Sequence, residues 1–136
     1  MEIVTESAEE TKALGRKIAA ELKEGPILAL TGDLGSGKTT FVQGFAKGLG
    51  FKGKIISPTF ILMRKYPHFY HVDLYRLEKN VWEEIRNLGI EDIWDDPKNV
   101  VVIEWAEKIK DRIPASAKWI KFENLGENDR KIVINH

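Results

Sequence analysis

The pattern of apolar and polar residues predicts alternating helices and strands along most of the chain. The first strong pattern is helical, because Leu14, Ile18 and Leu22 recur at four-residue intervals and form one apolar stripe. Ser7 and Glu10 form the S-x-x-E pattern of a capping box, so we expect the helix to begin just after Ser7.

Two unbroken apolar runs, at 27–30 and 100–103, predict buried strands. Strands that are covered on both faces of a parallel sheet show no alternation of polar and apolar residues, so we expect both runs to lie in such a sheet. A second helix is predicted over 38–49, and glycines at 48 and 50 mark its end. A glycine-rich segment therefore lies directly between a buried strand and a helix.

The remaining segments predict shorter elements. The stretch "ISPTFILMRKY" is interpreted as a turn that leads into a strand. A turn at Pro67 and His68 separates it from a strand at 69–74, which we expect to be its antiparallel neighbour. The segment 80–88 is predicted to be helical, with an apolar side formed by Val81, Trp82, Ile85 and Leu88. Further strands are expected at 1–5, 119–123 and 131–135, the last two paired across a polar loop. This order predicts an α/β fold, with a mixed, mostly parallel sheet and helices on both faces.

Composition narrows the class of protein. With 136 residues, 43% of them hydrophobic, we expect one domain over 1–136 with a substantial core. The 21 basic and 21 acidic side chains cancel and no basic stripe is present, so we expect no direct binding to DNA or other nucleic acid. The lack of cysteine suits a cytoplasmic protein, and every apolar run is too short to span a membrane.

The stretch "TGDLGSGKTTF" contains the pattern G-x-x-x-x-G-K-[ST], from Gly32 to Thr39. Glycines let backbone N–H groups turn toward a phosphate, and the following helix presents its positive N-terminus. We expect Lys38 to reach the β- and γ-phosphate oxygens and the Thr39 hydroxyl to bind Mg²⁺. A glycine-rich turn that matches by chance is the simpler alternative, and the strand–loop–helix context disfavours it. The residues expected to contact the nucleotide are Asp33, Leu34, Gly35, Ser36, Gly37, Lys38, Thr39 and Thr40.

Two carboxylates are candidates to act beside this loop. Glu104 follows the apolar run "VVVI" at the expected carboxyl end of a buried strand, where open α/β sheets bind ligands. Asp73, in "FYHVDLYRL", is the rival, because a carboxylate between Val72 and Leu74 needs a partner or a metal if it is buried. The alternatives are a solvated Glu104 at a strand end and an ordinary exposed strand face around Asp73.

Several classes of protein that share this phosphate-binding loop carry a second characteristic motif, and this chain lacks those motifs. The chain has no N-K-x-D motif for guanine, no ABC-type signature and no room for a second helical domain. Its six arginines are scattered, so no segment forms the arginine-rich lid expected of a small-molecule kinase. These absences favour a minimal ATPase.

Four segments resemble the TsaE family, formerly described as YjeE, the ATPase of bacterial tRNA threonylcarbamoyladenosine synthesis. They are "GDLGSGKTTF" at 32–41, "SPTF" at 57–60, "HVDLYRL" at 71–77 and "VVIEWAEK" at 101–108. The resemblance covers most of the chain and implies a single small P-loop NTPase domain with a mixed seven-stranded sheet. It implies that Lys38 binds phosphate and that Thr39 and Glu104 hold Mg²⁺. It also implies that Asp73 is required for ATP hydrolysis and that Thr59 is a switch-like threonine near the γ-phosphate.

Three other residues have simple interpretations. Trp105, beside Glu104, is by itself typical of a core residue. His71 is interpreted as a structural strand residue instead of a base. Arg130 is a candidate to reach the nucleotide from the C-terminal hairpin.

The resemblance also implies partners. Proteins of this family act with TsaB and TsaD, and TsaD transfers the threonylcarbamoyl group to tRNA, so tRNA is reached only through the complex. We therefore expect a cytoplasmic, Mg²⁺-dependent ATPase that binds ATP and ADP and resets the complex between turnovers. Two other functions remain open, a small-molecule kinase and a nucleotide-gated binding protein.

Overall fold

The structure, a computed structural model, describes residues 1–22, 26–55 and 62–135. Every helix in these ranges is too short or too polar to cross a lipid bilayer. The elements, in chain order, are β1 (Glu2–Thr5), α1 (Ala8–Glu21), β2 (Ile27–Thr31), α2 (Lys38–Gly48), β3 (Met63–Lys65), β4 (Tyr70–Asp73), α3 (Val81–Asn87), α4 (Ile90–Asp95), β5 (Val101–Glu104), the 3-10 helix η1 (Ala106–Arg112), β6 (Lys118–Asn124) and β7 (Arg130–Asn135).

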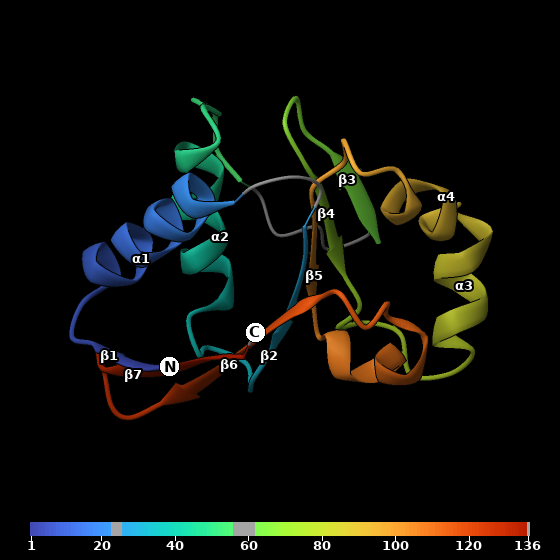
Figure 1. Cartoon of the computed structure of the whole chain (residues 1–136). Coiled ribbons are helices and arrows are strands. Elements are labelled where there is room, and N and C mark those ends of the chain that lie inside the picture. Colours follow the sequence, from blue (N-terminus) through green and yellow to red (C-terminus); the bar gives the residue numbers. More distant parts are fainter. Residues whose placement is uncertain (23–25, 56–61, 136) are drawn as a thin grey trace.

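The described strands form one seven-stranded sheet in the order β1-β7-β6-β2-β5-β4-β3 (Figure 1). β2 pairs in parallel with both β5 and β6, and β4 pairs in parallel with β5. The edges are antiparallel, since β3 pairs with β4 and β7 pairs with β6 and β1. The predicted mixed sheet is confirmed, with its parallel part in the middle, and so are the two predicted antiparallel pairs.

Helices cover both faces of the central strands, as predicted (Figure 1). Leu28 and Leu30 of β2 pack in the core beneath α1 and α2. Ile27 and Ala29, which alternate with them, pack in a second core with α3, α4 and η1. Both sets are almost fully buried, which explains why the sequence of β2 shows no polar position.

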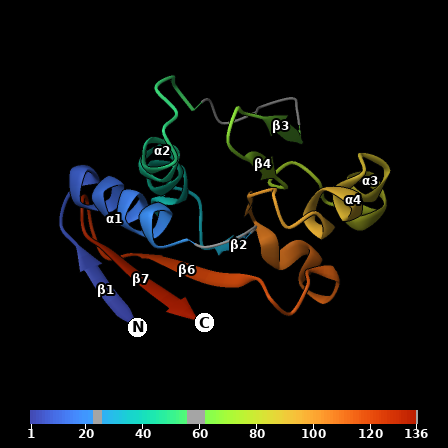
Figure 2. The same ribbon diagram turned by 45° about the horizontal axis from the view of Figure 1, so that its top comes forward.

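The outer strands are covered on one face only. Figure 2 shows α1 lying across β1 and β7, and no described helix covers their opposite face. That face carries charged side chains, where Lys131 lies 3.6 Å from Glu2 and 3.9 Å from Glu123. Because these charges are exposed or half-buried, the ion pairs add little stability, and they keep this part of the sheet hydrated.

Two elements were not predicted from the sequence. α4 and η1 are too short to show a helical repeat, and Gly89, with φ of 85°, separates α3 from α4. The prediction that Leu88 belongs to the apolar side of one helix over 80–88 is therefore wrong. α3 ends at Asn87, and Leu88 is 46% exposed, while Ile85 alone of the predicted apolar set is fully buried.

The helices α1 and α2 approach each other backbone to backbone. A Cβ atom at Gly44 of α2 would overlap the carbonyl group of Lys12 in α1. A Cβ atom at Gly15 of α1 would lie 2.8 Å from the backbone nitrogen of Phe45. The two glycines therefore set how closely α1 packs beside the helix that follows the glycine-rich loop.

We expect Gly44→Ala to destabilise the protein by about 1–3 kcal/mol, because the added methyl group has no space between the helices. Alanine otherwise favours a helix interior over glycine by about 1 kcal/mol, so a loss of stability would report the close contact. Urea unfolding followed by circular dichroism measures the change. Gly126→Ala is the control, since a Cβ there meets no atom within 4 Å. Unchanged or greater stability of Gly44→Ala would contradict the close approach.

Candidate functional site

Three parallel strands end beside one another at one edge of the sheet. β2 ends where the glycine-rich loop begins, β5 ends at Glu104 and β4 ends at Asp73. In the strand register Glu104 lies opposite Leu30 on one side and Asp73 on the other. The carboxyl ends of parallel strands are where open α/β sheets bind ligands, so this edge is the candidate functional site.

The loop between β2 and α2 leaves the start of α2 open. Gly32, Gly35 and Gly37 have φ of 138°, 77° and 102°, values that residues with side chains rarely adopt. Gly37 is the N-cap of α2 and contributes no side-chain hydrogen bond. The first N–H groups of an α-helix lack partners within the helix, so this end of α2 is suited to bind an anion.

Lys38 lies inside the loop that it follows. It is 5% exposed, and its Nζ donates hydrogen bonds to the carbonyl oxygens of Gly32 and of Asp33, the latter at 3.0 Å. The same ammonium lies 4.2 Å from the centre of the Trp105 ring, a cation–π distance. Burial lowers the pKa of Lys38, and the nearby carboxylates of Glu104, Glu107, Asp73 and Asp33 oppose that change.

The Thr39 hydroxyl and the Glu104 carboxylate face each other. Thr39 Oγ1 donates to Oε1 of Glu104 at 3.2 Å, and the second carboxylate oxygen is 3.5 Å away. Glu104 is 2% exposed, so the alternative of a solvated glutamate at a strand end is wrong. A hydroxyl and a carboxylate are ligands that suit Mg²⁺, which commonly takes one or two protein ligands together with substrate phosphates. No group of three His, Cys, Asp or Glu side chains suited to a metal occurs among the described residues.

His71 contacts the same carboxylate from the other side. Its Nε2 lies 2.6 Å from Oε2 of Glu104, and the His71 side chain is fully buried. The interpretation of His71 as a structural residue missed this contact. A signal was present, because strand alternation places His71 on the same side of its strand as Asp73, two residues later.

Asp73 and Trp105 border the site. Asp73 is half-buried, and its Oδ1 accepts a hydrogen bond from the backbone N–H of Tyr75 at 3.0 Å. Trp105 has a left-handed backbone, with φ of 61°, and its ring lies 5.1 Å from that of Tyr75. Trp105 therefore packs against the core with one part and faces the pocket with another, so it is more than a core residue.

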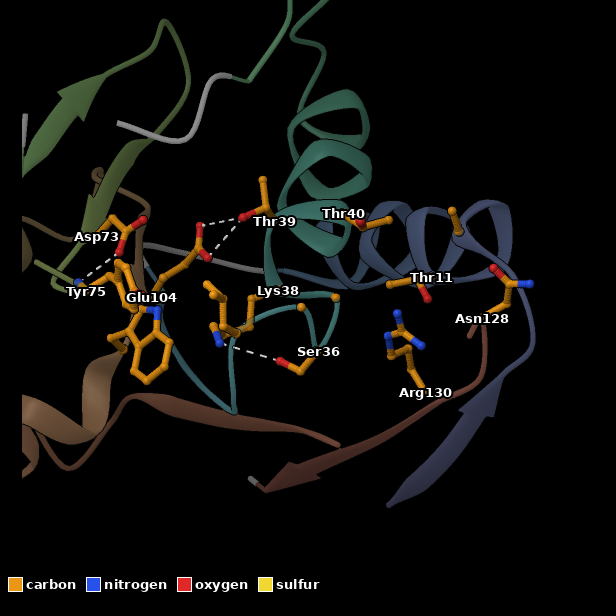
Figure 3. Close-up of a pocket in the computed structure, with 15 residues that line it drawn as sticks. Thr11, Ser36, Lys38, Thr39, Thr40, Asp73, Tyr75, Glu104, Asn128 and Arg130 are labelled. Atoms are coloured by element: carbon orange, nitrogen blue, oxygen red, sulfur yellow. Dashed lines mark hydrogen bonds between the residues drawn. The ribbon is translucent and has the colours of Figure 1, made fainter. Parts of the chain in front are cut away.

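A pocket of about 260 Å³ runs along the loop and joins most of the predicted residues. Figure 3 shows Asp73, Tyr75 and Glu104 at one end and Thr11, Asn128 and Arg130 at the other. Of the residues predicted to contact a nucleotide, Asp33 does not line this pocket. Thr59 lies outside the described residues. The other predicted residues all line it, namely Leu34, Gly35, Ser36, Gly37, Lys38, Thr39, Thr40, Asp73 and Glu104.

Sequence reasoning missed Ala8, Thr11 and Asn128, which also line the pocket. Ala8 and Thr11 belong to the first turn of α1, and Asn128 belongs to the turn between β6 and β7. None of them stands in a motif. Pairing of β1 with β7 brings these distant segments together, so only the fold reveals them.

The fold and the site define a small α/β protein with a mixed seven-stranded sheet, in which a glycine-rich loop joins a buried strand to a helix. The family model for threonylcarbamoyl adenosine biosynthesis protein TsaE matches residues 5–132, and the chain belongs to this family. A "tRNA threonylcarbamoyladenosine biosynthesis protein TsaE" of Bacillus subtilis is 39% identical over 96% of this chain and 82% of its own. The protein of the same name from Treponema pallidum is 35% identical over 98% of this chain and 99% of its own.

A solved structure agrees with the fold. The crystal structure of YdiB from Bacillus subtilis superposes with a TM-score of 0.75 and 34% sequence identity. The match covers 97% of this chain and 82% of that one. The resemblance inferred from four short segments is therefore confirmed over nearly the whole chain.

We expect the difference in stability between the wild type and Lys38→Met to change with pH. Burial lowers the pKa of Lys38, so the folded state disfavours the ammonium that the unfolded chain carries freely. As pH rises from the folded-state pKa toward the ordinary value of 10.5, the unfolded chain binds more protons than the folded one. The wild type should therefore gain stability relative to the variant in that window. Thermal unfolding between pH 7 and 10 checks this.

Lys47→Met is the matched control, because Lys47 is an exposed lysine of the same helix. It should show no such pH-dependent difference. A stability difference between the wild type and Lys38→Met that stays the same from about pH 7 to about pH 10 would contradict the expectation.

Proposed function

We propose that this protein is a Mg²⁺-dependent ATPase subunit of tRNA threonylcarbamoyladenosine synthesis that acts with the TsaB and TsaD proteins. The meeting of Lys38, Thr39 and Glu104 at one end of the pocket supports this proposal most directly. The pathway comes from the names of the relatives, which are biosynthesis proteins for this tRNA modification. We place its action in the cytoplasm and expect it to reach tRNA only through its partners.

The phosphates of ATP would lie along the loop. The open N–H groups at the start of α2 and the Lys38 ammonium would bind the β- and γ-phosphates, and Thr39 with Glu104 would hold Mg²⁺. The ion supplies positive charge that offsets the charge of the phosphate oxygens during hydrolysis. Lys38 is already buried at the loop, where its ammonium would exchange hydrogen bonds with loop carbonyl groups for hydrogen bonds with phosphate oxygens.

The hydrolytic water would enter at the end of the pocket that Asp73 borders. The Asp73 carboxylate accepts the Tyr75 N–H and faces the space beside Glu104, which suits it to orient a water molecule or the water shell of the ion. Arg130 is the one described arginine that lines the pocket, and it lies at the opposite end. Its guanidinium donates to carbonyl groups of the β6–β7 turn, such as that of Asp129 at 2.8 Å. We therefore expect slow hydrolysis by the isolated protein and faster hydrolysis in the complex.

The nucleoside would occupy the end of the pocket away from Glu104. Because the γ-phosphate belongs beside Lys38 and Thr39, the rest of the nucleotide extends past Thr40 toward Ala8, Thr11 and Asn128. The side chain of Arg130 packs against Gly37 there, since a Cβ on this glycine would lie 3.5 Å from Arg130 Cγ. Adenine is proposed because the chain lacks the N-K-x-D motif for guanine.

Reconstitution of the modification tests the proposal. With purified TsaB, TsaD, tRNA, a threonylcarbamoyl donor and ATP, we expect many turnovers with the wild-type protein and few without it. Lys38→Ala should bind ATP poorly and fail to support turnover. Glu104→Gln should bind nucleotide but lower hydrolysis about a hundredfold or more, with a matching loss of turnover. Glu91→Gln, at an exposed glutamate of α4, is the control and should behave like the wild type.

The results separate the proposed function from its alternatives. Modification that continues over many turnovers without this protein would contradict the assignment. Normal turnover with Glu104→Gln, combined with its loss in Lys38→Ala, would favour a nucleotide-gated binding protein. Consumption of ATP without release of free phosphate would favour a kinase.

A bulky side chain at the end of the pocket proposed for the nucleoside should weaken binding of ATP but not of a phosphate chain without a nucleoside. We expect Ala8→Trp to lower affinity for ATP at least about tenfold, since the indole would fill the end of the pocket beyond Thr40. Affinity for inorganic tripolyphosphate should not change, because that anion needs only the loop. Ala13→Trp, at an exposed position on the same helix, is the matched control. Titration calorimetry measures both ligands, and equal losses for both would place the nucleoside elsewhere.

A further inference from the structure

We propose that His71 is a positioning residue that holds the Glu104 carboxylate toward Thr39 through a hydrogen bond from Nε2–H. This inference rests on the proposed function, since it gives His71 a task in the binding of Mg²⁺ with the nucleotide. It goes beyond that function because it gives a role to a residue that lies behind the site and does not line the pocket.

The two oxygens of the Glu104 carboxylate have different partners. Oε2 lies 2.6 Å from His71 Nε2 and 3.5 Å from the Thr39 hydroxyl, whereas Oε1 has that hydroxyl as its partner, at 3.2 Å. Rotation of the carboxylate about its last bond would exchange the two oxygens, and any other rotation would break one of the contacts. His71 therefore holds the carboxylate in the orientation in which one oxygen faces Thr39 and the pocket.

The fold places the His71 imidazole beside Glu104, its one hydrogen-bond partner among the described residues. In the β4–β5 register His71 lies opposite Val102, and Asp73 lies opposite Glu104. One short strand thus supplies Asp73 at the mouth of the site and His71 behind the Glu104 side chain. Both His71 and Glu104 are almost fully buried, and a buried carboxylate is costly unless it is hydrogen-bonded.

The surroundings of the imidazole select its tautomer. Nδ1 is buried and has no hydrogen-bond partner among the described residues. If Nε2 carries the proton, it donates to the carboxylate, and Nδ1 is left as an acceptor without a partner. The opposite tautomer would place an acceptor nitrogen 2.6 Å from a carboxylate oxygen and bury an unpaired N–H. The geometry therefore favours the Nε2–H tautomer.

The hydrogen bond from His71 would affect Mg²⁺ binding through the Glu104 carboxylate, whose orientation it fixes. Loss of an outer hydrogen-bond partner of a metal-binding side chain typically weakens metal binding about 10–100-fold. Without His71, Oε2 of Glu104 would lose its nearest partner, and the carboxylate would be free to rotate out of the orientation that it has beside Thr39. Binding of the nucleotide without a metal should not depend on this orientation, because the loop and Lys38 bind the phosphates.

Two amide substitutions separate positioning from packing. In His71→Gln the amide nitrogen lies about where Nε2 does, so it can still donate to Glu104. In His71→Asn the shorter side chain places its amide near the position of Nδ1, where it cannot reach the carboxylate. We expect His71→Asn to weaken Mg²⁺-dependent ADP binding about 10–100-fold and His71→Gln to stay within about threefold of the wild type.

The readout is the dissociation constant of a fluorescent ADP analogue, measured with Mg²⁺ and again with EDTA. The constants in EDTA should agree for the wild type and both variants. Equal losses of Mg²⁺-dependent binding in the two variants, or no loss in either, would overturn the proposal. A parallel loss in EDTA would also overturn it, since His71 would then support the fold of the whole site.

A double-mutant cycle adds a test that tolerates some loss of stability. In a Glu104→Ala background, His71→Asn should cause no further loss of Mg²⁺-dependent binding, because the carboxylate that it positions is gone. Additive losses would overturn the proposal. If the wild-type protein binds no nucleotide under any condition, the proposed function itself is wrong, and this inference falls with it.

Discussion

The parallel alignment of β2, β4 and β5 is the constraint on which the site depends. It brings the glycine-rich loop, Glu104 and Asp73 to one edge of the sheet, although they are far apart in the sequence. A shift of β5 by one residue would turn Glu104 to the opposite face, away from Thr39. Burial of the alternating side chains in two separate cores fixes β2 and β5 in place, so the fold's stability and the site's geometry have the same origin.

The charged groups at this edge are buried and mutually oriented. Lys38 is held by carbonyl groups of its own loop and by the Trp105 ring, while Glu104 lies between Thr39 and His71. Burial works against the Lys38 ammonium, as the direction of its pKa shows, and the surrounding carboxylates only offset this. An anion bound in the loop would relieve that imbalance, which is consistent with a site arranged for phosphate at some expense of stability.

The pocket joins two parts of the fold that come from distant segments of the chain. The ends of β4 and β5 border one part, where the proposed chemistry would take place. The start of α1 and the β6–β7 turn border the other part, where the proposed nucleoside would lie. If the proposed function holds, this second part would connect a bound nucleotide to a hairpin and a helix that reach the surface.

The sequence by itself determined the elements with strong local signals and the chemistry of the loop. The capping box at Ser7, the unbroken runs of β2 and β5 and the G-x-x-x-x-G-K-T pattern each act over a few residues, so they can be read without the fold. The spacing of four motifs was also enough to identify the TsaE family. The roles of the site residues remain predictions.

Only the tertiary structure decided which residues meet across strands. The contact of His71 with Glu104 depends on the β4–β5 register, and the position of Asn128 near α1 depends on the β1–β7 pairing. α4 and η1 were missed because such short helices are stabilised by packing of residues such as Ile90 and Ile109, and not by their own periodicity. Local patterns fix what each segment is, whereas burial and strand pairing between distant segments fix what each side chain touches.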